Sequence, residues 1–173
     1  HNSDLNDIIG MFVNTVAIRS YPNAEKSFIT FLEEEKDIVL RAFDNQNYQF
    51  QELVRKLGLK RELSRNPIFD VMFELQNMDI PLMKSEDISI VKCDFVNKGA
   101  KFDILFEILE KDNTIMFNIE YCSKLFYEET IRRMGMHYIN ILTQIVNNPD
   151  LKISDINIIS DVEREQILNS FNN

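Results

Sequence analysis

The stretch at residues 102–121, FDILFEILEKDNTIMFNIEY, decides the fold. Apolar side chains occupy alternate positions on both sides of a polar pair, Asp112-Asn113. Strict alternation is typical of a strand with one buried face, and a polar Asp-Asn pair favours a turn. The stretch therefore predicts a β-hairpin with strands at 102–108 and 115–121.

Three further strands are predicted upstream of this hairpin. Residues 69–75 alternate in the same way, with one apolar face made of Phe69, Val71, Phe73 and Leu75. A weaker strand at 88–95 changes its alternation near Val91, as at a β-bulge. The stretch 10–19 is rich in apolar and β-branched residues, which also favours a strand.

Three helices are predicted around these strands. Residues 24–43 carry apolar side chains at helical spacing, and Asn23 is the expected N-cap. A short helix at 50–57 is expected to end at Gly58, and a long one spans about 128–146. The order of strand, two helices, several strands and a helix predicts an α+β sandwich with a mixed sheet.

The composition excludes several classes of protein. The 173 residues suit one domain with a sizeable core. The sequence has 19 Lys and Arg residues and 28 Asp and Glu residues, so its net charge is −9. This acidic balance argues against nucleic acid or an anionic membrane as a partner. No apolar run approaches the roughly 20 residues of a membrane span, no signal peptide is recognisable, and two cysteines are too few for a disulfide scaffold. A cytoplasmic location is predicted.

Both ends of the sequence are typical of a piece of a longer protein. The chain starts with His1 and enters an apolar stretch by Ile8. At the other end, an apolar segment at 153–159 precedes a helix that opens at 161–165. A linker into another domain is expected there, although a frayed tail would look similar.

Few residues suggest a complete catalytic or metal site. His137 is expected at the surface of the long helix or partly packed, and the lack of a His-x-x-x-His pattern excludes a helical zinc site. Cys93 and Cys122 are expected to act as small apolar side chains. Neither of the common glycine-rich phosphate-binding motifs occurs, and the carboxylates at 33–35 form a solvated helix face.

Three polar clusters interrupt apolar segments: Asn14-Thr15, residues 45–48 and residues 64–67. Asparagine is disfavoured within strands, so the amide of Asn14 is expected to have a specific partner. Arg65 is able to fix a loop or to clamp a carboxylate. On the sequence pattern alone, each cluster is better explained as a capped turn or a buried hydrogen-bond network without a chemical role.

At these clusters the sequence resembles the condensation domains of nonribosomal peptide synthetases. The fifth core motif of that family is matched at 9–19 by Gly10, Phe12, Asn14, Thr15 and Arg19. The sixth is matched at 45–51 by Gln46, Tyr48 and Phe50, although Gln49 and Gln51 replace the usual proline and glutamate. The seventh is matched at 61–70 by Ser64, Arg65, Asn66, Pro67 and Asp70.

The resemblance implies a fold like half of chloramphenicol acetyltransferase, with a mixed sheet flanked by helices. The family has two such lobes that meet at a tunnel, and its N-terminal lobe carries a His-His-x-x-x-Asp-Gly motif linked to catalysis. No His-His pair occurs here. The resemblance therefore implies the C-terminal lobe at 1–155 and a linker toward an adenylation domain at 156–173.

The implied reaction joins an aminoacyl amine to a thioester on the phosphopantetheine arm of a carrier domain, in the bacterial synthesis of antibiotics and other secondary metabolites. By this resemblance the chain binds no cofactor itself, and its partners are the N-terminal lobe, peptidyl carrier domains and an adenylation domain. The chain alone is predicted to be inactive.

Site roles also follow from the resemblance. Asn14 would orient the substrate or stabilise the oxyanion, with a purely structural role left open, and Arg65 would hold its loop. Two other interpretations remain: a module that docks carrier proteins without chemistry, and a free-standing acyltransferase of another kind. The lack of an evident catalytic base argues against the second.

Overall fold

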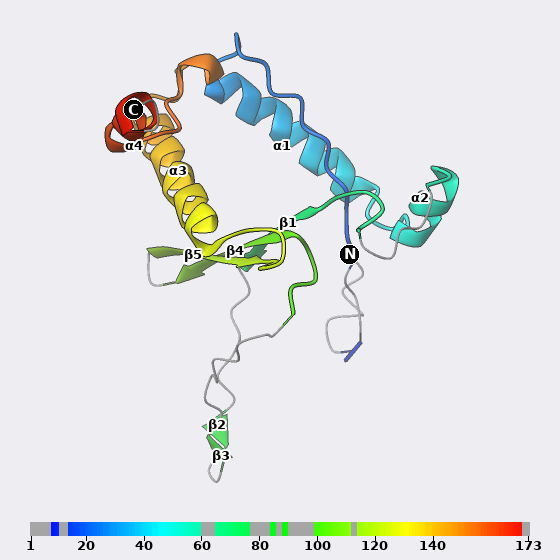
Figure 1. Cartoon of the computed structure of the whole chain (residues 1–173). Helices are drawn as coiled ribbons and strands as arrows, with labels where there is room; N and C mark the ends of the chain where they lie inside the picture. Colours follow the sequence, from blue (N-terminus) through cyan, green and yellow to red (C-terminus); the bar gives the residue numbers. More distant parts are fainter. Residues whose placement is uncertain are drawn as a thin grey trace. The chain divides into compact units, whose positions relative to one another are not determined.

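The computed structural model describes residues 8–10, 14–59, 65–76, 84–85, 88–89, 99–111 and 114–170. They form two compact units, which are described separately here. The helical unit is drawn from residues 1–63 and 145–156, and the sheet unit from residues 64–144 and 157–173. Figure 1 labels their helices and strands. Phe12, Ser64, Val91, Cys93 and the Asp112-Asn113 turn lie outside the described residues.

The helical unit contains α1 (Phe28–Asp44) and α2 (Phe50–Lys56). The cap of α1 is Ser27, whose side chain accepts a hydrogen bond from the Thr30 N–H. The predicted N-cap, Asn23, and the predicted start of the helix at residue 24 are therefore wrong. The short second helix is confirmed, and it is followed by Gly58 with a φ of 62°, a left-handed conformation that suits glycine.

The late start of α1 has a physical cause in the backbone ahead of it. The carbonyls of Ala24 and Lys26 accept hydrogen bonds from the N–H groups of Ser154 and Ile153, at 3.0 and 2.9 Å. The N–H groups of Phe28 and Ile29, which a helix starting at residue 24 would direct to residues 24 and 25, donate instead to the carbonyls of Leu151 and Pro149 at 2.8 and 2.9 Å. Ser27 forms an isolated antiparallel bridge with Lys152, and helical geometry begins only after it.

The predicted strand at 10–19 is wrong over residues 14–19, which form irregular chain. No described strand pairs with them, and a strand persists only through the ladder with its neighbour. Side chains attach this segment instead. Ser20 Oγ donates to Glu35 Oε2 on α1 at 2.6 Å, and Asn14 contacts the turn after α1.

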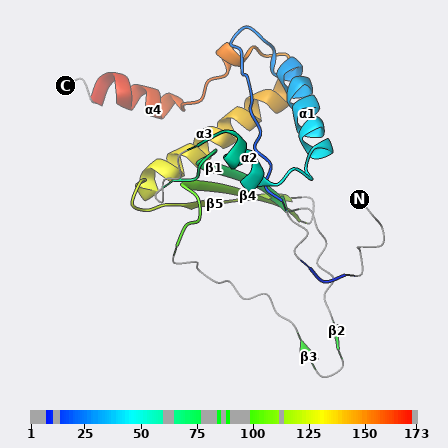
Figure 2. The same cartoon turned by 90° about the vertical axis from the view of Figure 1, so that its right-hand side faces the viewer.

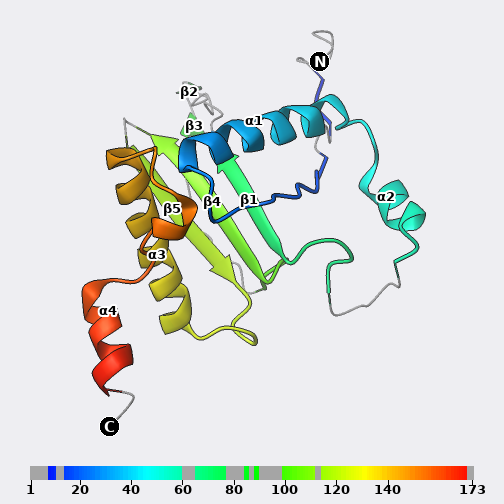
Figure 3. The ribbon, with the colours of Figure 1, turned by 90° about the horizontal axis from the view of Figure 1, so that it is seen from above.

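The sheet unit is built on a mixed three-stranded sheet in the order β1-β4-β5 (Figure 3). The strands are β1 (Val71–Gln76), β4 (Ile104–Lys111) and β5 (Thr114–Tyr121). Parallel pairing of β1 with β4 and antiparallel pairing of β4 with β5 confirm the predicted mixed sheet and hairpin. Of the weaker predicted strand, the described residues include only β3 (Ile88–Ser89), paired with β2 (Lys84–Ser85).

Helix α3 (Glu128–Asn147) confirms the long predicted helix and lies across one face of β4 and β5 (Figure 2). Ile104 and Ile108 on β4 and Ile131 on α3 are buried. A Cβ added at Gly135 would lie 3.6 Å from Ile119 Cδ1, so the helix approaches β5 closely. Burial of these side chains supplies the apolar core of the sheet unit.

Strand β1 leaves its apolar face open. The parallel register places Val71, Phe73 and Leu75 beside Ile104, Phe106 and Ile108, so these side chains point to one side of the sheet. The side chains on β1 are nevertheless 54%, 60% and 52% exposed, respectively. The predicted alternation is confirmed, but on this strand its apolar half is not buried.

The chain then passes through η2 (Ile153–Asp155), α4 (Asp161–Glu165) and the π-helical turn η3 (Gln166–Ser170). The helix predicted to open at 161 is confirmed. Within the described part of the chain, no helix has the length and apolar character needed to cross a membrane.

Candidate functional site

Asn14 joins two motif segments within the helical unit. Its Nδ2 donates to the carbonyl oxygens of Gln46 at 2.5 Å and of Tyr48 at 3.1 Å. Its Oδ1 accepts from the Thr15 N–H at 2.9 Å. An asparagine amide has two donor hydrogens, so both have acceptors here. The specific partner expected for Asn14 is therefore the backbone of the turn that follows α1.

That turn is built by the end of α1. The N–H groups of Asn45, Gln46 and Tyr48 donate to carbonyls three residues earlier, at 3.0–3.1 Å. The Asn45 side chain also donates to the Arg41 carbonyl at 2.8 Å. These bonds close the chain tightly after the helix and leave the carbonyls of Gln46 and Tyr48 as acceptors for Asn14. The polar cluster at residues 45–48 therefore lies in this turn.

The rest of the sixth motif leads into α2. Lys56 Nζ lies 5.4 Å from the centroid of the exposed Tyr48 ring, a cation–π distance. Phe50 is the first residue of α2 and is half-buried. Gly10 and Arg19 of the fifth motif are exposed.

The seventh motif lies in the sheet unit, in the loop just before β1. Arg65 Nη2 forms an ion pair with Asp70 Oδ2 at 2.5 Å. Of the two roles predicted for this arginine, fixing a loop or clamping a carboxylate, this contact is the second. Asn66 Oδ1 accepts from the Ile68 N–H at 3.3 Å, and Pro67 is half-buried. The Arg65–Asp70 ion pair and the Asn66 side-chain turn thus both close the loop on itself.

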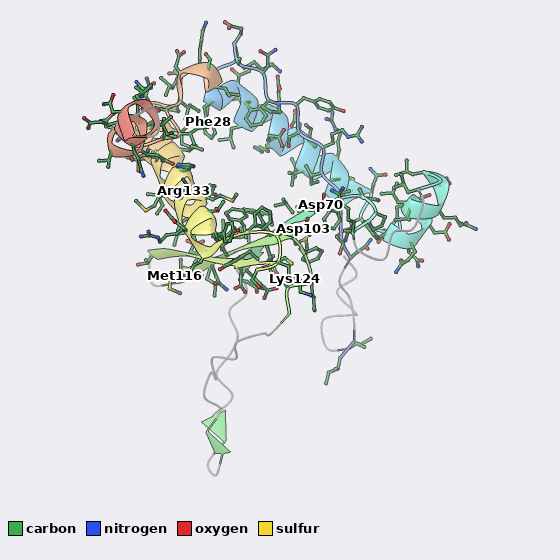
Figure 4. All side chains as sticks on the ribbon, in the orientation of Figure 1. Phe28, Asp70, Asp103, Met116, Lys124 and Arg133 are labelled. Carbon is green, nitrogen blue, oxygen red and sulfur yellow. The ribbon has the colours of Figure 1, made fainter. Side chains whose placement is uncertain are left out.

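Asp70 also ties this loop to the end of the sheet. It lies beside Asp103, whose N–H donates to the Asp70 carbonyl at 3.1 Å (Figure 4). The Asp103 carbonyl in turn accepts from the Cys122 N–H at 3.0 Å. Backbone hydrogen bonds therefore link the residues that flank β1, β4 and β5, and the loop closed by Arg65 begins from this fixed point.

The structure therefore joins Asn14 of the fifth motif to Gln46 and Tyr48 of the sixth, and it forms the seventh-motif cluster within the other unit. Among the described residues, no group of three or more His, Cys, Asp or Glu side chains could hold a metal ion. Burial raises the pKa of Tyr138, whose ring contacts Phe106 and Phe117 beneath α3.

Sequence reasoning missed one polar cluster. His137 was expected on the helix surface or partly packed, and it is part-buried, but its Nε2 lies 2.7 Å from Glu163 Oε2. The signal available in the sequence is Ser160-x-x-Glu163, the pattern of a capping box, which marks Glu163 as a residue with a local role. The pattern indicates the helix start but not the partner on α3.

Comparison with known proteins agrees with the motif pattern. A family model described as Condensation domain matches residues 1–168. Gramicidin S synthase 2 of Brevibacillus brevis is 44% identical over 173 residues, which are 99% of this chain and 4% of that protein. Surfactin synthase subunit 2 of Bacillus subtilis (strain 168) is 42% identical over 165 residues, 95% of this chain and 5% of that protein. The chain thus spans about one twentieth of the length of these relatives.

Solved structures show the same fold at lower identity. The X-domain in its complex with OxyB from teicoplanin biosynthesis has a TM-score of 0.75 and 23% identity, covering 92% of this chain and 35% of that one. A crystal structure of the X-domain from teicoplanin biosynthesis has a TM-score of 0.74 and 21% identity, covering 90% and 36%. At this identity the likeness describes the fold alone, and it confirms the predicted α+β class.

Proposed function

This chain belongs to the condensation-domain family, and we propose that it forms the C-terminal lobe of a peptide-bond-forming condensation domain in a nonribosomal peptide synthetase. The observation that carries the proposal is the side-chain amide of Asn14, which binds the fifth and sixth motif segments into one local structure. A chance match of motifs would give no reason for these two segments to meet. The seventh motif supports the proposal through its closed loop beside the sheet.

In the proposed reaction, the amine nitrogen of an acceptor aminoacyl group attacks the carbonyl carbon of a donor thioester. A C–N bond forms, the C–S bond breaks, the donor arm leaves as a thiol, and the amine loses a proton. Both reactants are tethered to phosphopantetheine arms that belong to carrier domains. Holding them in position is worth an effective concentration on the order of 10⁵ M or more, so much of the catalysis is placement.

Within that reaction the role of this chain is to shape one wall of the tunnel. The family resemblance implies that Asn14 orients the substrate or stabilises the oxyanion, or that its role is purely structural; the first role is retained as a proposal in a modified form. Because both amide hydrogens of Asn14 are given to Gln46 and Tyr48, its effect on the substrate is exerted through the 45–48 turn. Asn14 is then a positioning residue, and the groups that this turn presents are the ones that meet the substrate.

The proposal assigns the remaining partners by family. The N-terminal lobe of the same domain supplies the His-His-x-x-x-Asp-Gly motif, which these 173 residues lack. Peptidyl carrier domains deliver the two substrates, and an adenylation domain follows the lobe. The cytoplasm of a bacterium is the proposed location, and the relatives named above are bacterial synthetases. Nucleic acid and membrane are not among the proposed partners.

A single-turnover assay with two loaded carrier proteins tests the proposal. The chain alone is expected to form no dipeptide above the uncatalysed rate, whereas the chain joined to its N-terminal lobe is expected to form it. Product from the chain alone would contradict the lobe assignment in favour of a free-standing acyltransferase. Carrier binding without product from the joined lobes would instead favour the docking-module alternative.

A further inference from the structure

One face of α3 carries three polar side chains in a row. His137, Asn140 and Gln144 are spaced three and four residues apart, so they lie on the same side of the helix. All three contact the segment at residues 157–163, here called the strap. Both the strap and this part of α3 belong to the sheet unit.

Gln144 makes the strongest of these contacts. Its Nε2 donates to the Asn157 carbonyl at 2.6 Å, and its Oε1 accepts from the Asn157 N–H at 2.9 Å. Both polar groups of one backbone residue are thereby satisfied by one side chain, as a neighbouring strand would do. Gln144 and Asn157 are part-buried, so water competes poorly for these groups.

The other two contacts lie further along the strap and closer to the start of α3. Asn140 Nδ2 donates to the Ile158 carbonyl at 3.3 Å, and His137 Nε2 lies 2.7 Å from Glu163 Oε2. As residue numbers rise along the strap, those of their partners on α3 fall. The strap therefore runs antiparallel to α3, fixed at three points over about two turns of helix.

The Glu163 side chain does not make the hydrogen bond that the sequence pattern at the start of α4 would allow. Ser160 caps α4 by accepting from the Glu163 N–H at 3.2 Å, which is half of a capping box. In the complete box the glutamate side chain would return to the N-cap N–H. Here the carboxylate contacts His137 instead, and the two side chains are only 27% and 18% exposed. The start of α4 is thus bonded to α3 rather than only to itself.

We propose that the row His137, Asn140 and Gln144 is a clasp that makes the strap part of the lobe and sets the direction in which the chain enters α4. The segment predicted as a linker from residue 156 then begins with a joint that is bonded to α3 from Asn157 to Glu163. The clasp itself does not depend on the proposed function. That function adds only that the joint positions a following domain.

Amide hydrogen exchange on the 173-residue chain tests the clasp. The probes are the amides of Asn157, Glu163 and Arg164, which all donate hydrogen bonds in this segment. In Gln144→Ala they are expected to exchange about tenfold faster, the effect of losing a two-point hydrogen bond, while amides of β4 keep their rates. The matched control is Thr143→Ala, because Thr143 is exposed on the same helix and its hydroxyl donates to the Ile139 carbonyl of that helix rather than to the strap.

Three results would overturn the proposal. The first is a strap whose amides already exchange at the rate of a free peptide in the unsubstituted chain. The second is an equal acceleration in β4, which would make Gln144 a general stabilising residue. The third is no difference between Gln144→Ala and the control. If Gln144→Ala does not fold, Asn140→Ala removes one longer bond and is expected to give the same local pattern at about threefold. Exchange reports no peptide-bond formation, so the clasp and the proposed function fail independently.

Discussion

The two units hold their motif residues by different means. In the sheet unit, the loop with Arg65 starts from strands that are packed under α3, with Ile104 and Ile108 buried. In the helical unit, neither α1 nor α2 contains a buried residue, and the motif turn is held by the amide of Asn14. Apolar burial is non-directional and large in sum, whereas each hydrogen bond is directional and small. One motif site therefore depends on packing and the other on the placement of a few polar atoms.

The largest expected effect tests the packing side of this comparison. Ile104 is 5% exposed, so Ile104→Ala removes buried methyl groups and leaves a cavity beneath α3. We expect a loss of about 3 kcal/mol in the free energy of unfolding, measured by urea denaturation followed by circular dichroism. Val71→Ala, on the 54% exposed partner in the register, is the control and is expected to cost less than about 1 kcal/mol. Equal losses would show that β1 is buried in solution.

The next effect tests the polar side. Asn14→Ala removes the amide that binds Gln46 and Tyr48, and we expect about 1–2 kcal/mol of lost stability, with a condensation rate at least about tenfold lower in the two-lobe domain. Asn14→Asp keeps the oxygen that accepts from the Thr15 N–H but loses both donors. It should resemble Asn14→Ala in both measurements.

This pair of variants distinguishes a positioning role from direct contact with the substrate. If Asn14 acts through the turn, exchange of the Gln46 and Tyr48 amides should rise together with the loss of rate. A normal turn with a lost rate would return Asn14 to direct substrate contact. A lost turn with a normal rate would make its role purely structural.

How much of this could be predicted from the sequence differs between the units for a physical reason. The hairpin of β4 and β5 and helix α3 follow from local periodicity, which the chain carries within each element. The start of α1 could not be predicted, because it depends on hydrogen bonds with residues 149–154, more than a hundred residues away. The stretch at 14–19 has a strand-like composition but no partner strand among the described residues.

The candidate site shows the same limit. The sequence predicts a partner for Asn14, because asparagine is disfavoured in the strand expected there. It also predicts that Arg65 fixes a loop or clamps a carboxylate, because a guanidinium group can make two-point contacts. It gives no indication that Gln144 and His137 hold the strap. Those contacts depend on the antiparallel run of 157–163 along α3, which is a property of the folded chain.

A smaller effect is expected at the seventh motif. Arg65 is 62% exposed at its side chain, so its ion pair with Asp70 is largely solvated. We expect Arg65→Ala to cost about 0.5–1 kcal/mol, less than a buried clamp would. Arg65→Lys keeps the charge and should recover part of that loss, and high salt should reduce the difference. A loss above about 2 kcal/mol would place Arg65 among the packing contacts of the sheet unit.

The smallest expected effect is on stability at alkaline pH. It concerns Tyr138, which combines an apolar ring in the core with a polar phenol group. The Tyr138 ring packs edge-on against Phe117, with centroids 5.1 Å apart, and burial raises the pKa of its phenol above the ordinary 10.0. The folded state therefore holds this proton more tightly than the unfolded chain does. The resulting stability is fully present below pH 10 and is lost as the pH rises through the higher pKa of the folded state. Tyr138→Phe keeps the ring contact and removes the proton, so its unfolding midpoint should fall less steeply above pH 10 than that of the unsubstituted chain. Identical slopes would mean that the phenol is solvated in the folded protein, and that only the ring of Tyr138 belongs to the core under α3.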